Sequence, residues 1–179
     1  MKNKPRSFRP TLTILEERCV PTAFSEPVVL SSVDGFLDVT LFAHQSVQSL
    51  ETLVAGVPTP TQVSQLLTYQ WTLNAGLASD GKTTGEAYPG PTFKVNRGDT
   101  MRIRLENGLE NLAINPPVTT PPTPPVTEMP INNHTHGLHI SPAAASDNVL
   151  VTLPAGESFV YEYVISGDQP NGLMWMHPQ

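Results

Sequence analysis

Hydrophobic and polar residues alternate along several segments of this chain. In residues 100–107, the apolar side chains of Met101, Ile103 and Leu105 alternate with polar ones. In residues 157–167, aromatic or aliphatic side chains occupy every second position. A period of two residues is the pattern of a strand with one buried face and one solvated face. Both segments are therefore predicted to be strands, and residues 100–107 a half-solvated antiparallel one.

Further strands are predicted where β-branched, leucine and aromatic residues cluster between turn residues. These segments are 27–33, 36–47, 68–74, 92–95, 148–153 and the stretch around Trp175. The pair Asp34-Gly35 separates the first two segments and is a hairpin signal. Residues 51–67 are the one place where a short helix is expected, although the sequence GVPTPT interrupts it.

The remaining segments predict loops within a single domain. Residues 78–91 have the composition of a loop. Residues 116–130 hold seven prolines in fifteen residues and predict an extended excursion. Because strands with the same pattern lie on both sides, this excursion is interpreted as a loop and not as a linker between domains. The prediction is an all-β fold, a Greek-key β-sandwich over residues 25–179.

Composition agrees with this fold class and excludes some functions. Nineteen prolines, twelve glycines and only 15% charged residues are typical of strands and turns. Residues 1–10 contribute four positive charges to a net charge of −6, so the rest of the chain carries −10. An acidic body argues against a nucleic-acid partner. No apolar run approaches the roughly 20 residues of a membrane helix, so no membrane span is expected.

The first 24 residues are basic and separate from the strand pattern. The stretch LEERCVP resembles a short leader found on many bacterial exported proteins, which implies export to the periplasm or the extracellular space. The alternative is a disordered basic tail. Cys19 in this stretch is the only cysteine, so no intrachain disulfide is expected.

Four of the five histidines lie in two short pieces, INNHTHGLHIS and GLMWMHPQ. In a strand, His134 and His136 would share one face, about 6.6 Å apart at about 3.3 Å per residue. His139 would face away, and antiparallel packing would bring His177 beside the first pair. Gly137 leaves room for close approach. Imidazoles without thiolate or carboxylate point to copper or zinc, and the alternative is a pair of hydrogen-bonded structural histidines.

Residues 131–178 resemble the first plastocyanin-like domain of bacterial multicopper oxidases, the laccase family. The resemblance rests on the H-x-H-G and W-x-H-P elements in this order, and residues 88–109 resemble the same domain. It implies a cupredoxin-type fold in which His134 binds the type 2 copper, while His136 and His177 bind the type 3 pair. It also implies oxygen reduction coupled to oxidation of a reducing substrate.

The sequence departs from the family pattern in two places. Gln179 stands where the family has another histidine, and no H-C-H segment is present to build a blue type 1 copper site. The chain alone is therefore expected to be inactive, with the remaining ligands supplied by a second cupredoxin domain or chain. The family's last strands are also expected to be missing, as in a truncated or split chain, which would expose a sheet edge.

Two other functions stay open at this point. One is a stand-alone module that binds or stores metal without turnover. The other is an exported structural β-domain whose histidines are relics. Metal binding distinguishes the first of these from the second, and an H-C-H segment encoded further downstream would favour the oxidase over both.

Overall fold

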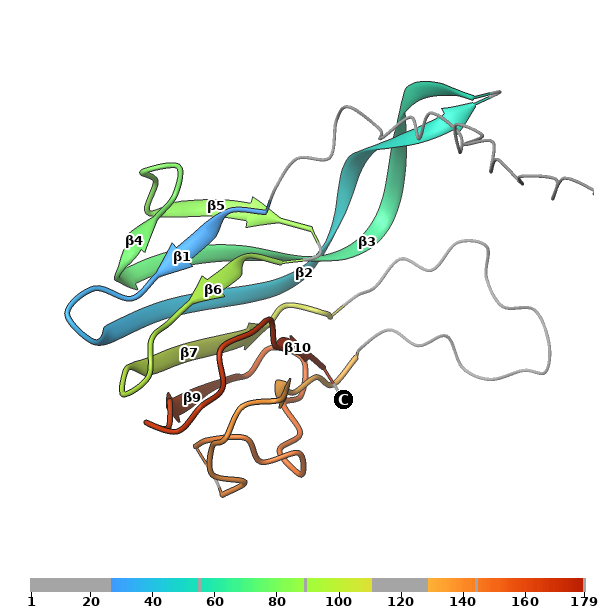
Figure 1. Ribbon diagram of the computed structural model, residues 1–179. Helices are drawn as coiled ribbons and strands as arrows, with labels where there is room; N and C mark the ends of the chain where they lie inside the picture. Colours follow the sequence, from blue (N-terminus) through green and yellow to red (C-terminus); the bar gives the residue numbers. More distant parts are fainter. Residues whose placement is uncertain (1–26, 55, 89, 111–128, 144, 179) are drawn as a thin grey trace, which may run out of the picture.

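The computed structural model describes residues 27–178 except residues 55, 89, 111–128 and 144 (Figure 1). Four expectations therefore lie outside the described residues, namely those on segment 1–24, on Cys19, on Gln179 and on most of the proline-rich segment 116–130.

The described residues form ten strands and no helix, which confirms the all-β prediction. None of them forms a helix long and apolar enough to cross a membrane. The strands are β1 (Val29–Ser31), β2 (Phe36–Val54), β3 (Val57–Ala75), β4 (Leu77–Ala78), β5 (Thr84–Ala87), β6 (Thr92–Lys94), β7 (Thr100–Asn107), β8 (His134–His136), β9 (Ser158–Val164) and β10 (Trp175–His177).

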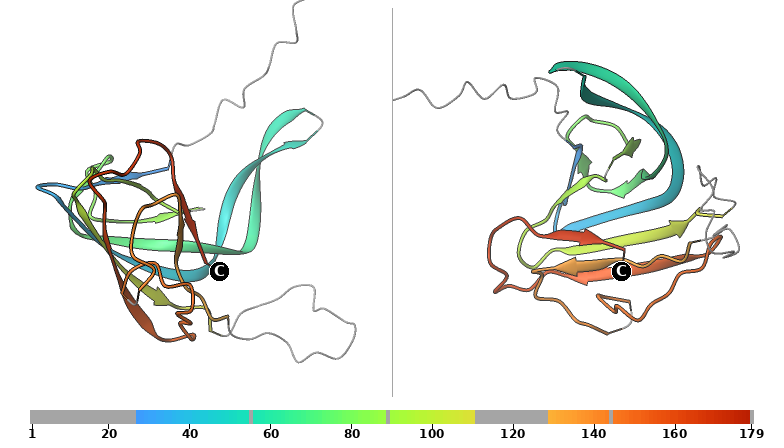
Figure 2. Two further views of the ribbon diagram at one scale, coloured as in Figure 1. Left: turned by 60° about the horizontal axis from the view of Figure 1, so that its bottom comes forward. Right: turned by 90° about the vertical axis from the view of Figure 1, so that its right-hand side faces the viewer.

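The strands are arranged in three sheets, and the two larger ones are of mixed direction. The largest has the order β5-β3-β2-β7-β9, in which β2 and β7 are parallel and the other neighbours are antiparallel. A second sheet has the order β4-β1-β6, and β8 pairs with β10 in a two-stranded ribbon. Figures 1 and 2 show the two smaller sheets over one face of the five-stranded sheet, which is a sandwich-like arrangement.

The core lies on the inward face of β2, β7 and β9. Its alternating residues are buried and form one cluster with Leu30 of β1 and Ala78 of β4. Complete burial of a valine, leucine or isoleucine side chain stabilises a fold by about 1.5–3 kcal/mol. The buried apolar residues of the three strands are Leu37, Val39, Leu41, Ala43, Met101, Ile103, Leu105, Tyr161 and Tyr163.

The polar residues of the same strands face solvent, as the alternation predicts. Arg102 lies 3.0 Å from Glu162 on β9 and 3.5 Å from Asp38 on β2. These ion pairs link three neighbouring strands across the outer face. Because all three side chains reach solvent, these ion pairs contribute little to the stability of the fold.

The expectation of a short helix in residues 51–67 is wrong. The segment forms the distal part of β2 and β3, which pair as far as Val54 and Val57 with one register shift between Ser46 and Gln48. Threonine and valine are frequent in this stretch, and both favour strands over helices. Figure 2 shows the two strands projecting well beyond the body of the domain.

The turn at Asp34-Gly35 is present, but the hairpin expected from it is not. Asp34 and Gly35 have positive φ values of 50° and 81°, as the paired turn residues of a tight turn require. Only Val33 and Phe36 form a bridge, after which β1 and β2 enter different sheets. The turn at residues 96–99, with the sequence NRGD, likewise joins strands of different sheets, because β6 belongs to the small sheet and β7 to the large one.

Two smaller expectations also change. Residues 148–153 form a turn and not a strand, and only Leu153 makes a bridge, to Ile131. The side chain of Asn148 accepts a hydrogen bond from the backbone of Leu150, which favours the turn. Within the expected loop 78–91, β5 forms and extends the edge of the large sheet beside β3.

Asp99 joins the two main sheets at the turn between β6 and β7. Its buried carboxylate accepts hydrogen bonds from the Ser32 hydroxyl at 2.5 Å and from the Asn96 backbone N–H at 2.7 Å. Burial alone would raise the pKa of Asp99, but the hydrogen bonds from Ser32 and Asn96 hold it below its usual value.

We expect Asp99→Asn to destabilise the fold by about 1–3 kcal/mol at neutral pH, since hydrogen bonds to an ionised acceptor are lost. The folded pKa is lowered, so this stability is present above the unfolded pKa of about 3.9 and is lost as pH falls through the folded value. The difference in the free energy of unfolding between wild type and variant, measured by urea unfolding, should therefore become smaller below about pH 4. Asp34→Asn, at an exposed turn position where Asn adopts the same backbone, is the control. If the difference in the free energy of unfolding stays constant with pH, the ionised Asp99 carboxylate does not stabilise the fold in this way.

Candidate metal centre

The ribbon of β8 and β10 brings the predicted histidines together. The two strands are antiparallel, with His177 opposite His134 and Trp175 opposite His136. This register confirms the expected antiparallel approach of His177 to the first pair. Residues directly opposite one another point to the same side of a ribbon, so all four rings share one face. The alternate residue Thr135 is buried on the other face.

The three imidazole rings are in direct contact. The ring of His134 meets that of His136 edge-on, with centroids 4.7 Å apart, and that of His177 at 5.7 Å. The rings of His136 and His177 are nearly parallel, and their Nε2 atoms lie 3.0 Å apart. A pair of ring nitrogens this close either shares one hydrogen bond or faces a common ligand.

In two of these rings, His134 and His177, the Nδ1 atom forms a hydrogen bond with an oxygen outside the histidine cluster. Nδ1 of His134 lies 3.1 Å from Oδ1 of Asp147, and Nδ1 of His177 lies 2.5 Å from the backbone oxygen of Pro178. Carboxylate and carbonyl oxygens only accept hydrogen bonds, so in both rings Nδ1 carries the proton. Nε2 of each neutral ring then carries the lone pair, as in a metal-binding histidine, and in His177 this atom faces Nε2 of His136.

Trp175 fixes the ring planes of His136 and His177. It stacks on His136 with centroids 4.4 Å apart and on His177 at 4.5 Å. The Trp175 side chain is nevertheless 61% exposed. The centre therefore lies at the surface of the molecule, with an aromatic residue beside it.

Buried hydrogen bonds support the ribbon from the core. The phenol of Tyr161 accepts a hydrogen bond from the backbone N–H of Asn133 at 3.0 Å, and that of Tyr163 accepts one from its side-chain amide at 2.7 Å. Burial raises the pKa of both Tyr161 and Tyr163 above the usual value for a phenol. Both phenols therefore stay neutral at physiological pH and hold the residue that precedes His134.

A second anchor holds the chain after His136. The side-chain amide of Gln169 donates to the backbone oxygen of Gly137 at 2.9 Å and accepts from the backbone N–H of His139 at 2.6 Å. Gly137 has a φ of +87°, so this position requires glycine for its backbone conformation. Gly137 therefore has a backbone role in addition to the close approach expected from the sequence.

The other two histidines lie apart from the centre. The ring of His139 lies 3.7 Å from Asp168 on an exposed part of the chain, consistent with the expectation that it faces away. His44 lies on β2, where its ring contacts Thr68 and Glu86. Neither ring contacts the imidazoles of the ribbon among the described contacts.

The donor set fits a borderline metal ion. Two imidazole nitrogens that bind one ion at about 2.0–2.1 Å lie about 3–4 Å from each other, which includes the separation of His136 and His177. Among the described residues, no three His, Cys, Asp or Glu side chains are arranged to hold one ion together. The geometry therefore offers a pair of nitrogens and a third imidazole beside them. It does not form a closed site. Imidazole donors suit copper and zinc.

Sequence reasoning did not identify Asp147, Asn133 or Gln169. Asp147 lies 13 residues after His134, inside a loop whose path no local pattern predicts. The signal for Asn133 was present, since buried tyrosines in β9 need hydrogen-bond partners. The sequence does not show which residue lies opposite them.

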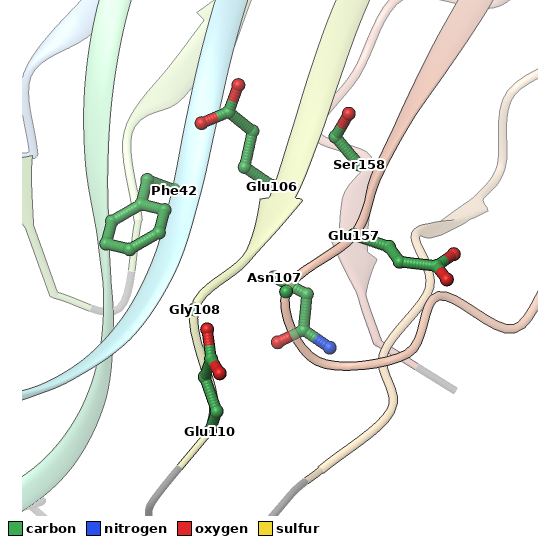
Figure 3. A pocket seen from close by; sticks show the side chains of 8 residues that line it. Phe42, Glu106, Asn107, Gly108, Glu110, Glu157 and Ser158 are labelled. Carbon is green, nitrogen blue, oxygen red and sulfur yellow. The ribbon is translucent and has the colours of Figure 1, made fainter.

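A separate hollow lies where β7 ends, and Figure 3 shows the side chains that line it. Its walls include Phe42 and the carboxylates of Glu106, Glu110 and Glu157, which point in different directions. The amide of Asn107 is already bound to the backbone oxygen of Leu153 at 2.9 Å. The hollow therefore has no converging ligands and contains none of the ribbon's histidines.

No protein-family model matches this chain, and no curated protein matches it at a significant level.

We expect Tyr163→Phe to destabilise the protein by about 1–3 kcal/mol, because the buried Asn133 amide would lose its acceptor. Urea unfolding at neutral pH measures the change. Tyr88→Phe removes a hydroxyl from a residue that is 46% exposed and should change the stability by less than about 0.5 kcal/mol. Equal effects of the two substitutions would show that the Asn133 contact does not stabilise the fold.

Proposed function

We propose that this chain is a copper-binding domain of cupredoxin type that supplies type 2 and type 3 histidines to a multicopper oxidase. The single observation that carries the proposal is the convergence of His136 and His177, 41 residues apart in sequence, with Nε2 atoms 3.0 Å apart. His134 lies in ring contact with both. The resemblance of the H-x-H-G and W-x-H-P segments to that family supports the choice of copper.

The histidines have distinct roles in this proposal. His134 binds the type 2 copper, while His136 and His177 bind the type 3 pair. Asp147 accepts the Nδ1 proton of His134 and so presents its Nε2, and the Pro178 carbonyl does the same for His177. Copper, when bound, supplies the electron transfer to dioxygen from a reducing substrate. The protein's own groups set the orientation and protonation of the ligands.

A second cupredoxin domain or chain completes the ligand set in this proposal. Its support is the position of the centre at the surface, where Trp175 is 61% and Leu173 is 99% exposed. Exposed apolar side chains beside an incomplete ligand set are typical of a surface that another domain covers.

The finer fold and the location belong to the same proposal. The mixed, sandwich-like sheets are compatible with a Greek-key cupredoxin domain. The leader-like segment LEERCVP favours export to the periplasm or the extracellular space.

One observation favours a second candidate, a stand-alone metal-binding module without turnover. The nitrogens of His136 and His177 are close enough to bind one ion without further protein ligands. Such a module would bind copper or zinc as an isolated chain and would gain no ligand from a partner. An exported structural β-domain would bind neither metal.

We expect the double substitution His134→Ala and His136→Ala to abolish copper binding, because two of the three converging imidazoles are lost. Metal analysis after dialysis against a copper solution measures the bound copper per chain. His139→Ala and His44→Ala, which change rings outside the ribbon, are matched controls and should leave binding unchanged. Equal loss in the His139→Ala variant would overturn the assignment of the site.

The copper-loaded chain by itself should neither show an intense blue absorption nor consume oxygen with phenols or reduced metal ions. A blue centre needs a thiolate with histidines, and Cys19, the only cysteine, matches no such motif. Visible absorption and an oxygen electrode test this. Steady oxygen uptake, or an intense thiolate-to-copper band, would contradict the proposed incomplete site.

A further inference from the structure

The distal parts of β2 and β3, residues 45–54 and 57–67, form a two-stranded extension that we call the arm. β7 pairs with β2 only as far as Ala43, and β5 pairs with β3 only over Tyr69–Thr72. No other described strand pairs with the arm. Figures 1 and 2 show it projecting away from the sheets that form the core.

An isolated ribbon of this kind is not stable by itself in water. A ten-residue strand is about 33 Å long, and a lone two-stranded hairpin is marginal without a third strand or a packed face. The arm also exposes apolar side chains, with Val47 61%, Val54 57% and Val57 61% accessible to solvent. These features favour a partner that pairs with the arm.

The outer edge of β3 is blocked at two positions near the tip of the arm. Pro58 lies opposite Leu53 and Pro60 lies opposite Glu51. Proline has no N–H, so these rungs are the ones without mutual hydrogen bonds, in which the backbone groups point outward. At both positions the outward edge of β3 therefore lacks a donor. Prolines placed in this way protect an edge strand from further pairing.

The outer edge of β2 is open. In the same rungs the backbone N–H and C=O groups of Glu51 and Leu53 point outward, away from β3. Ser49 lies two residues before Glu51 and opposite Gln62, so its backbone points outward as well. The arm thus has one edge with a row of donors and acceptors and one edge with prolines.

The arm is almost free of charge, and this selects the kind of partner. Among residues 45–67 only Glu51 is charged, although the chain carries a net charge of −6. With one negative charge and no cation, the arm has no group that binds nucleic acid or an anionic membrane. A strand with an open edge and little charge is complementary to the arm, and the β2 edge of a second copy is such a strand.

We propose that two copies of this chain pair through the β2 edges of their arms, antiparallel and around a two-fold axis. The strand order would be β3-β2 of one copy followed by β2-β3 of the other. Both strands of each arm then belong to a four-stranded sheet, which removes the instability of the lone ribbon. The outer edges of this sheet are the proline edges of β3, so pairing stops at the dimer and does not continue into a filament.

Sedimentation velocity over a concentration series tests the proposal on the full chain. The wild type should form a dimer of about twice its 19.4 kDa mass. Ser49→Pro removes an outward donor from β2, and by symmetry from both copies, so dimerisation should weaken by at least about tenfold. Gln62→Pro changes the directly opposite residue on the edge that prolines already close, and dimerisation should be unchanged.

Each outcome decides for or against the proposal. A wild type that stays monomeric at all concentrations would overturn it. So would a Ser49→Pro variant that dimerises like the wild type, because the contact would then lie elsewhere. If Gln62→Pro weakens dimerisation as much as Ser49→Pro, the difference between the two edges is absent and the proposal fails. Circular dichroism shows whether the two variants remain folded alike, and copper binding should be unaffected in both.

Discussion

The alternation of side chains along β9 is the constraint on which both the core and the histidine ribbon depend. In the observed register, Tyr161 and Tyr163 are fully buried and lie beside Ile103 and Met101 of β7. Their hydroxyl groups then have to find partners away from water, and both find Asn133. A slip of one residue would place Val160 and Glu162 inward and would leave the segment before His134 without its two buried hydrogen bonds.

The ribbon that these bonds support has unequal faces. Thr135 is buried against the core, while His136 and Trp175 are exposed on the other face. An imidazole cluster inside the core would have to be neutral and fully satisfied by the protein. These rings instead lie together beside the exposed Trp175, and this position at the surface is the physical basis of the proposed half-site.

The two ends of the large sheet use polar groups in opposite ways. At the turn before β7, the buried Asp99 carboxylate satisfies its surroundings and joins two sheets. At the far end, the arm carries almost no charge and leaves the backbone of one edge unpaired. The first arrangement stabilises one chain, whereas the second is suited to contact between chains.

The sequence by itself determined the all-β class, the buried faces of residues 100–107 and 157–167, and the shared face of His134 and His136. Each of these follows from a period of two residues, which is local information. Tertiary structure alone decided that β1 and β2 separate at the Asp34-Gly35 turn, that residues 51–67 extend a hairpin, and that Asp147 meets His134. These outcomes depend on which strand lies opposite which, and pairing partners far apart in sequence leave no local pattern. The approach of His177 lies between the two cases: the aromatic strand suggested it, but only the register of β8 and β10 places the two nitrogens 3.0 Å apart.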